Sequence, residues 1–248
     1  MKNFVWIVLF LLAGCAGQTE RPSYGGESNL RERARIHTEL GAGYYAQNQL
    51  GIALEEFNEA SQIDPSYALA HNGLGLVYAA LREDAKADAS FKKAIQLEPA
   101  NSESRNNYGT FLCSRGRYDE SVVQFLEAVK NPLYVTPGVA YMNAGVCSLR
   151  KADIPNAEVY LKRALQVQPV LHQAAYQLAL IEFDRSQPLR AREYLQTPLS
   201  NDPTAEMLWL GVKVERQLGG RDAEASYALQ LRKKYPNSEQ TKALLSGQ

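Results

Sequence analysis

The sequence has no excess charge of either sign and no recognisable catalytic motif. Its 248 residues include 27 lysines and arginines and 27 aspartates and glutamates, so the formal net charge is zero. A balanced chain has no overall field that would attract nucleic acid, and we expect no nucleic-acid partner. A glycine-rich phosphate loop, a Ser-His-Asp signal and a paired-carboxylate motif are all missing. We therefore expect a protein that is not an enzyme and that needs no metal or other cofactor.

Long apolar runs are also missing, except at the start of the chain. Lys2 precedes an apolar run from Phe4 to Leu12, which is too short to span a bilayer and leads to Cys15. This layout predicts a lipoprotein signal peptide over residues 1–14, because its Leu-Ala-Gly-Cys ending resembles a lipobox, in which the cysteine thiol receives diacylglycerol. Residues 15–29 then form a lipid-anchored flexible tether. The alternatives are a plain secretory peptide, in which Cys15 is incidental, and an uncleaved membrane anchor.

The remainder of the chain is built from an internal repeat. A pair that ends in glycine recurs every 34 residues, as Leu40-Gly41, Leu74-Gly75 and Tyr108-Gly109. Small residues, a phenylalanine and a closing proline follow at the same spacing, as in Ala53, Phe57, Ala60 and Pro65, then Ala87, Phe91, Ala94 and Pro99. This is the tetratricopeptide pattern, in which each unit is a pair of antiparallel helices. It predicts an all-α, superhelical (solenoid) stack of six helix pairs with a short C-terminal capping helix.

The repeat also sets the expected domain boundaries. The repeat domain covers residues 30–248, and its units are 34–67, 68–101, 102–137, 138–171, 172–203 and 204–236, with the cap at 237–248. The third unit is two residues longer than the period, and its loop at residues 131–137 contains two prolines. Pro198 is expected to shorten the second helix of the fifth unit.

In such a stack the first helix of each unit lines the concave side, which is the expected binding surface. The candidate partner-binding residues on these helices are Thr38, Ala42, Tyr45, Leu69, Asn72, Leu76, Asn106 and Thr110. This groove is largely apolar with a few amides, so it suits an apolar peptide or an amphipathic helix. The alternative is that these residues contact neighbouring helices and complete the core. His37 and His71 share one repeat position, where we expect packing residues rather than metal ligands.

Cysteine is scarce, and besides Cys15 the chain has only Cys113 and Cys147. Both lie on first helices of adjacent predicted units. Such helices are about 8–10 Å apart, and the two positions differ in height by about 3 Å. A disulfide is therefore geometrically possible, and an exported protein permits it. Two buried free thiols are the alternative.

Two segments are more specific than the repeat signature. One runs from Asn106 to Cys113 and is followed by Asn131-Pro132-Leu133-Tyr134 and residues 143–147; the other runs from Ala225 to Leu231 and is followed by residues 235–238. Together with the lipobox and the six repeats, they resemble the PilF/PilW family of type IV pilus biogenesis lipoproteins, also called pilotins. The resemblance covers nearly the whole mature chain.

The resemblance implies a non-catalytic lipoprotein, monomeric by itself, that is held in the outer membrane by the acylated Cys15 and faces the periplasm. Ala16, in place of an aspartate, agrees with sorting to that membrane. The implied partners are outer-membrane lipid and the pilus secretin, which the protein would help to reach the outer membrane and to multimerise. The family's apolar groove for the secretin maps onto Ala42, Tyr45, Leu69, Asn72 and Leu76. An alternative is a periplasmic repeat lipoprotein that serves peptidoglycan enzymes or outer-membrane protein assembly, although the two specific segments would not be expected in it.

Overall fold

The computed structural model describes residues 26–200 and 202–247, so the predicted signal peptide, Cys15 and most of the tether lie outside the described residues. The described residues form thirteen α-helices. These are α1 (Gly26–Ala46), α2 (Leu50–Ile63), α3 (Ala68–Ala80), α4 (Asp84–Leu97), α5 (Ser102–Ser114), α6 (Tyr118–Ala128), α7 (Pro137–Arg150), α8 (Ile154–Val167), α9 (His172–Asp184), α10 (Pro188–Ser200), α11 (Ala205–Leu218), α12 (Arg221–Lys234) and α13 (Glu239–Leu245). The predicted solenoid of six helix pairs with a terminal helix is confirmed.

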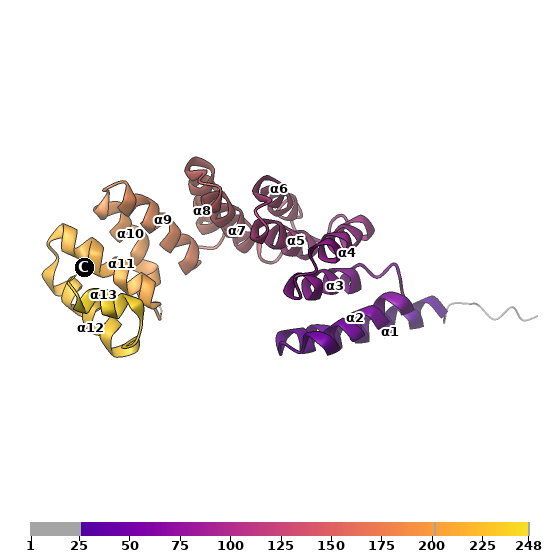
Figure 1. Cartoon of the computed structure of the whole chain (residues 1–248). Helices are drawn as coiled ribbons and strands as arrows, with labels where there is room; N and C mark the ends of the chain where they lie inside the picture. Colours follow the sequence, from indigo (N-terminus) through magenta and orange to yellow (C-terminus); the bar gives the residue numbers. More distant parts are fainter. Residues whose placement is uncertain (1–25, 201, 248) are drawn as a thin grey trace, which may run out of the picture.

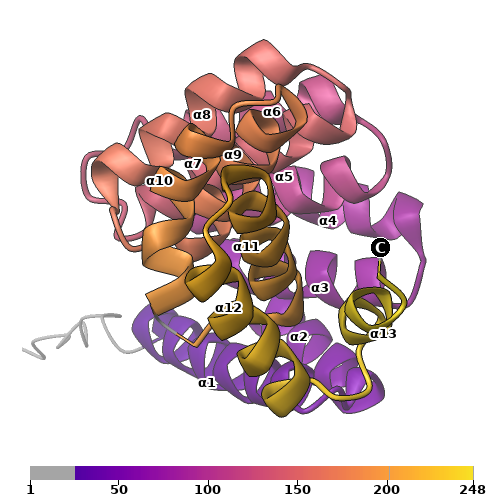
Figure 2. The same ribbon diagram turned by 90° about the vertical axis from the view of Figure 1, so that its left-hand side faces the viewer.

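The helix pairs follow one another along an arch, with α1 and α2 at one foot and α11 to α13 at the other (Figure 1). Seen from the side, the same pairs wind as a superhelix (Figure 2). Each helix packs chiefly against its partner in the pair and against the next helix along the chain. Within residues 26–200 and 202–247, no helix is both long enough and apolar enough to cross a membrane.

Each pair is closed by a short turn whose bend depends on one residue with positive φ. The residues in this position are Asn48, Arg82, Gly116, Ala152, Ser186 and Gly219, with φ between 58° and 75°. Only the third and sixth turns use glycine, although left-handed backbone costs other L-residues about 1–2 kcal/mol. The packing of the two helices therefore holds the turns in this conformation.

Large side chains of the second helices fill the space between pairs. Phe57 and Phe125 are 2 % and 1 % exposed, and burying a side chain of this size contributes about 1.5–3 kcal/mol. A Cβ atom added to Gly73 would lie 2.2 Å from Cε1 of Phe57, and one added to Gly109 would lie 2.7 Å from Cε1 of Phe125. Glycine is thus required at these points because an aromatic ring lies directly against the helix backbone.

Three boundaries differ from the sequence-based expectation. The tether was expected to extend to residue 29, but α1 begins at Gly26. Arg31 supports α1 near its start. The guanidinium of Arg31 lies 5.4 Å from the centre of the Tyr67 ring and 3.5 Å from Glu98. Pro137 belongs to α7 rather than to the preceding loop, since proline is favourable in the first turn of a helix. Pro198 does not end α10, which continues to Ser200.

Candidate protein-binding surfaces

The eight candidate groove residues differ widely in their exposure. Ala42 and Thr110 are exposed, and Thr38 and Asn72 are buried at 9 % and 7 % exposure. The other four are half-buried, namely Tyr45, Leu69, Leu76 and Asn106. The concave side therefore offers a partner only part of the apolar surface that the repeat positions suggest.

The half-buried apolar candidates also contribute to the core. Tyr45 packs against the cluster that contains Phe57, and Leu69 packs against the cluster that contains Tyr67. Leu76 packs in the same way against the cluster around Phe91. At these three positions the structure supports both interpretations, since each side chain completes the core with one part and faces solvent with the other.

Asparagines link the first helices of three successive units. The side-chain amide of Asn107 in α5 donates a hydrogen bond of 3.3 Å to Oδ1 of Asn72 in α3. On the other side, Asn143 in α7 donates one of 3.0 Å to Oδ1 of Asn106. The neighbouring asparagines of α5 thus reach in opposite directions along the stack. These bonds give the Asn-Asn string a structural role between units.

Tyr108 and Gly109 complete the same string with contacts of their own. The Tyr108 hydroxyl donates a 2.8 Å hydrogen bond to Oδ1 of Asp88 in α4, and burial is the main reason that the pKa of Tyr108 is raised. Burial also opposes ionisation of Asp88, but hydrogen bonds from Lys92, Arg117 and Tyr108 outweigh it and lower the pKa of this carboxyl. Gly109 accepts a 2.8 Å hydrogen bond from the hydroxyl of buried Ser121 through its carbonyl.

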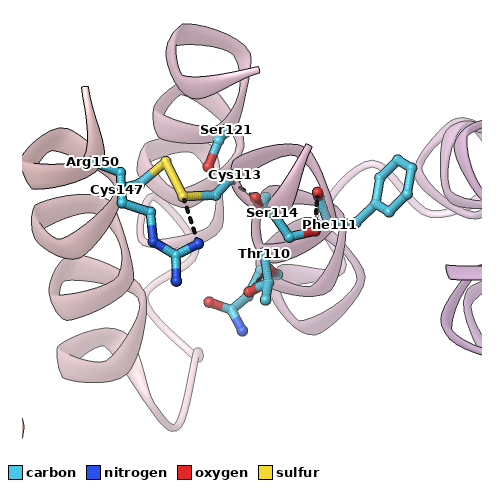
Figure 3. The surroundings of a disulfide bond; sticks show 9 residues. Thr110, Phe111, Cys113, Ser114, Ser121, Cys147 and Arg150 are labelled. Atoms are coloured by element: carbon cyan, nitrogen blue, oxygen red, sulfur yellow. Dashed lines mark hydrogen bonds between the residues drawn. A yellow bond between two sulfur atoms is a disulfide. The ribbon is translucent and has the colours of Figure 1, made fainter. Parts of the chain in front are cut away.

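The third and fourth units are also joined covalently. Cys113 in α5 and Cys147 in α7 form a disulfide, with their Cα atoms 5.8 Å apart (Figure 3). The two cysteines are 8 % and 0 % exposed. Arg150 lies beside the bond, with Nη1 4.0 Å from Sγ of Cys113. The disulfide joins α5 to α7, and the asparagine pairs join α3 to α5 and α5 to α7.

The second specific string builds the C-terminal end of the stack. Leu231 is fully buried in a cluster that α11 and α12 share, and Tyr227 packs against it. The Tyr235 hydroxyl donates a 2.8 Å hydrogen bond to the carbonyl of Pro203. Ser238 caps α13 by accepting a hydrogen bond from the backbone N–H of Thr241. Both strings therefore hold the repeats together.

An apolar surface that the sequence reasoning missed lies on the outer side of α1. Ile36 and Leu40 are 44 % and 46 % exposed. With Gly43 and Tyr44 they border a pocket of about 400 Å³. Helical spacing places residues 36, 40 and 43 on one stripe, and this stripe is opposite the residues that face α2. The signal was present in the sequence, because the apolar residues Ile36 and Leu40 are four positions apart and so lie on one side of a helix.

His37 and His71 each contact a protein group nearby. Nδ1 of His37 lies 2.7 Å from Oε2 of Glu56, and Nε2 of His71 lies 3.0 Å from the carbonyl oxygen of Pro65. In the part of the chain that the structure describes, no group of three or more His, Cys, Asp or Glu side chains is placed to hold a metal ion.

Comparisons with known proteins agree with this architecture. Models of the tetratricopeptide repeat match residues 41–81, 68–101 and 90–122. The type IV pilus assembly protein PilF of Pseudomonas aeruginosa is 28 % identical over 235 residues, which cover 94 % of this chain and 93 % of that protein. The solved structure of P. aeruginosa PilF has a TM-score of 0.78 and 28 % identity, with 89 % of this chain and all of that chain covered. The structure of PilW, a type IV pilus biogenesis factor, is 33 % identical with a TM-score of 0.74, and the match covers 86 % of this chain and 98 % of that one.

Proposed function

The chain belongs to the PilF/PilW family of type IV pilus biogenesis proteins, and from this premise we propose that it is a non-catalytic lipoprotein scaffold of the outer membrane. In this role it helps the pilus secretin to reach the outer membrane and to multimerise there. The fold fits such a role, because a stack of helix pairs offers extended surfaces that bind other proteins.

The exposed stripe on α1 is the observation that best supports partner binding. Ile36 and Leu40 are both exposed on α1 and border one pocket, and apolar surface exposed in this way is typical of an interaction site. The secretin segment that binds here is apolar and covers Ile36 and Leu40. Ala42, Tyr45, Leu69 and Leu76 form a second part of the proposed binding surface, on the concave side.

The lipid anchor determines the membrane at which the binding surface acts. Acylated Cys15 anchors the chain to the outer membrane on its periplasmic side, and Ala16 after it is compatible with sorting to that membrane. The repeat domain then shields an apolar segment of the secretin from aggregation during transit. The anchor and the apolar stripe act on one partner. The stripe lies on α1, the first described helix after the tether, and α1 is therefore the described helix nearest to the anchor along the chain.

Replacing the lipidated cysteine tests this function. In cells with Cys15→Ser, we expect the heat-stable secretin multimers of the outer membrane to fall to the level of a strain without the gene, while secretin monomer persists. Wild-type multimer levels in Cys15→Ser cells would contradict lipid-dependent delivery. Wild-type levels after deletion of the whole gene would contradict the secretin role itself.

A further inference from the structure

The loop between α6 and α7 exposes two large apolar side chains. Leu133 is 84 % exposed and Val135 is 90 % exposed, more than the other large apolar side chains of the described residues. The loop lies where the sequence departs from its 34-residue period, so the repeat fold does not require it. The exposure of two such side chains on one loop is typical of an interaction surface.

The loop is held in place by its own polar groups. The side-chain amide of Asn131 donates a 3.2 Å hydrogen bond to the carbonyl of Ala100. Its Oδ1 accepts a 3.0 Å hydrogen bond from the N–H of Leu133, and its carbonyl accepts one of 3.1 Å from the N–H of Tyr134. Tyr134 is half-buried, and this burial raises its pKa. Leu133 and Val135 are thus presented by an anchored loop, which lowers the entropy cost of binding a partner.

A shallow pocket adjoins these side chains and carries acidic groups. It has a volume of about 540 Å³ and is bordered by Leu133, Tyr134 and Val135 on one side and by the turn from Glu98 to Glu103 on the other. Glu98 has a partner in Arg31, 3.5 Å away. Glu103 is exposed and has no ion-pair partner among residues 26–200 and 202–247. The pocket therefore combines uncovered apolar surface with an uncompensated negative charge.

We propose that this surface, formed by residues 131–136 and the Glu98–Glu103 turn, binds a protein segment that carries both apolar side chains and lysine or arginine. The apolar side chains cover Leu133 and Val135, and a cation approaches Glu103. Charge complementarity favours this occupant over an anionic lipid surface, which the carboxylate of Glu103 would repel. The site is distinct from the apolar stripe of α1, and the proposal holds whether or not the secretin is the partner.

Peptides of defined composition test the proposal. The full-length protein is titrated by calorimetry with three acetylated, amidated peptides of equal length, made of alternating Leu and Lys, Leu and Glu, or Ser and Lys. We expect the Leu-Lys peptide to bind at least about tenfold more tightly than the other two, since only it satisfies both features of the site. Equal binding of all three would overturn the proposal.

Matched variants locate the binding. Leu133→Ser with Val135→Ser is expected to weaken Leu-Lys binding by roughly tenfold or more. Glu103→Gln should weaken it less and reduce its salt dependence. The control is Leu189→Ser with Val170→Ser, which replaces a leucine and a valine of 62 % and 63 % exposure elsewhere on the surface.

Loss of binding in the control to the same degree would overturn the proposal. It would also be overturned if the loop variant left peptide binding intact. A third contrary result concerns membranes. The proposal would be overturned if the Cys15→Ser chain bound phosphatidylethanolamine–phosphatidylglycerol vesicles and the loop variant did not, because the loop would then contact lipid.

Discussion

The two ends of the stack are finished differently. At the C-terminal end, α13 covers α11 and α12, and Thr241 is 2 % exposed with its hydroxyl donating a 2.7 Å hydrogen bond to the carbonyl of Tyr235. At the N-terminal end of the described residues, α1 leaves Ile36 and Leu40 nearly half exposed. Terminal units of repeat proteins normally have polar outer faces that keep them soluble. Apolar side chains are exposed at the C-terminal end too, since Leu229 and Leu245 are 59 % and 70 % exposed, but Ile36 and Leu40 border one pocket on α1, where we place the binding end.

Truncating one leucine at each end should show this difference most strongly. Leu231→Ala removes a fully buried side chain and is expected to lower the free energy of unfolding by about 2–5 kcal/mol. Leu40→Ala removes a side chain that is 46 % exposed and borders the pocket on α1, so its expected cost is below about 0.5 kcal/mol. Urea unfolding followed by circular dichroism measures both. Equal losses at the two ends would contradict the comparison.

The disulfide should stabilise the middle of the stack, between the two ends. Cys113 and Cys147 are separated by 34 residues, and closing a loop of this length is worth about 2–4 kcal/mol. We expect Cys113→Ala with Cys147→Ala to lower thermal stability and to leave the surface of α1 unchanged. Thiol titration of the denatured, non-reduced protein checks the premise. Two free sulfhydryls at these positions would contradict it.

Replacing two glycines near the N-terminal end should change stability by smaller amounts, and the two substitutions should act in opposite directions. Gly73→Ala places a Cβ atom against the ring of Phe57, and the forced shift should cost about 1–3 kcal/mol. Gly43→Ala meets no atom within 4 Å and should stabilise α1 by about 0.5–1 kcal/mol through helix propensity. Thermal unfolding of both variants compares them. A stabilising Gly73→Ala would mean that Phe57 does not pack as described.

The sequence predicted the stack because the residues that pack the helices together recur at a fixed spacing along the chain. Residues equivalent to Gly109 and Phe125 recur at fixed intervals in other units, so both helices of a unit and the contact between them could be predicted. The start of α1 could not be placed in this way, since Arg31 is supported by Tyr67 at the end of the first unit and by Glu98 of the second. Pro198 was misjudged for a related reason. It is one of the buried residues of α10, and this burial does not follow from the sequence of α10 alone.

The candidate site was predicted less well than the fold. Repeat position alone does not reveal that Asn72 is buried and hydrogen-bonded to Asn107 while Ala42 is exposed. These differences depend on which side chains of adjacent helices meet. The stripe around Leu40 was missed because leucine before the repeat glycine was taken as part of the repeat pattern, and in the first unit that leucine lies on the uncovered side.

The most direct test of the account is the affinity of the purified pilus secretin for the protein with Ile36→Ser and Leu40→Ser. Leu189→Ser, at a position of α10 that is 62 % exposed, serves as the control. If the uncovered end of the stack is the binding end, the double variant should lose about tenfold or more in affinity while its unfolding midpoint stays near that of the unsubstituted protein. Unchanged secretin affinity in a folded Ile36→Ser, Leu40→Ser protein would contradict the assignment of binding to α1.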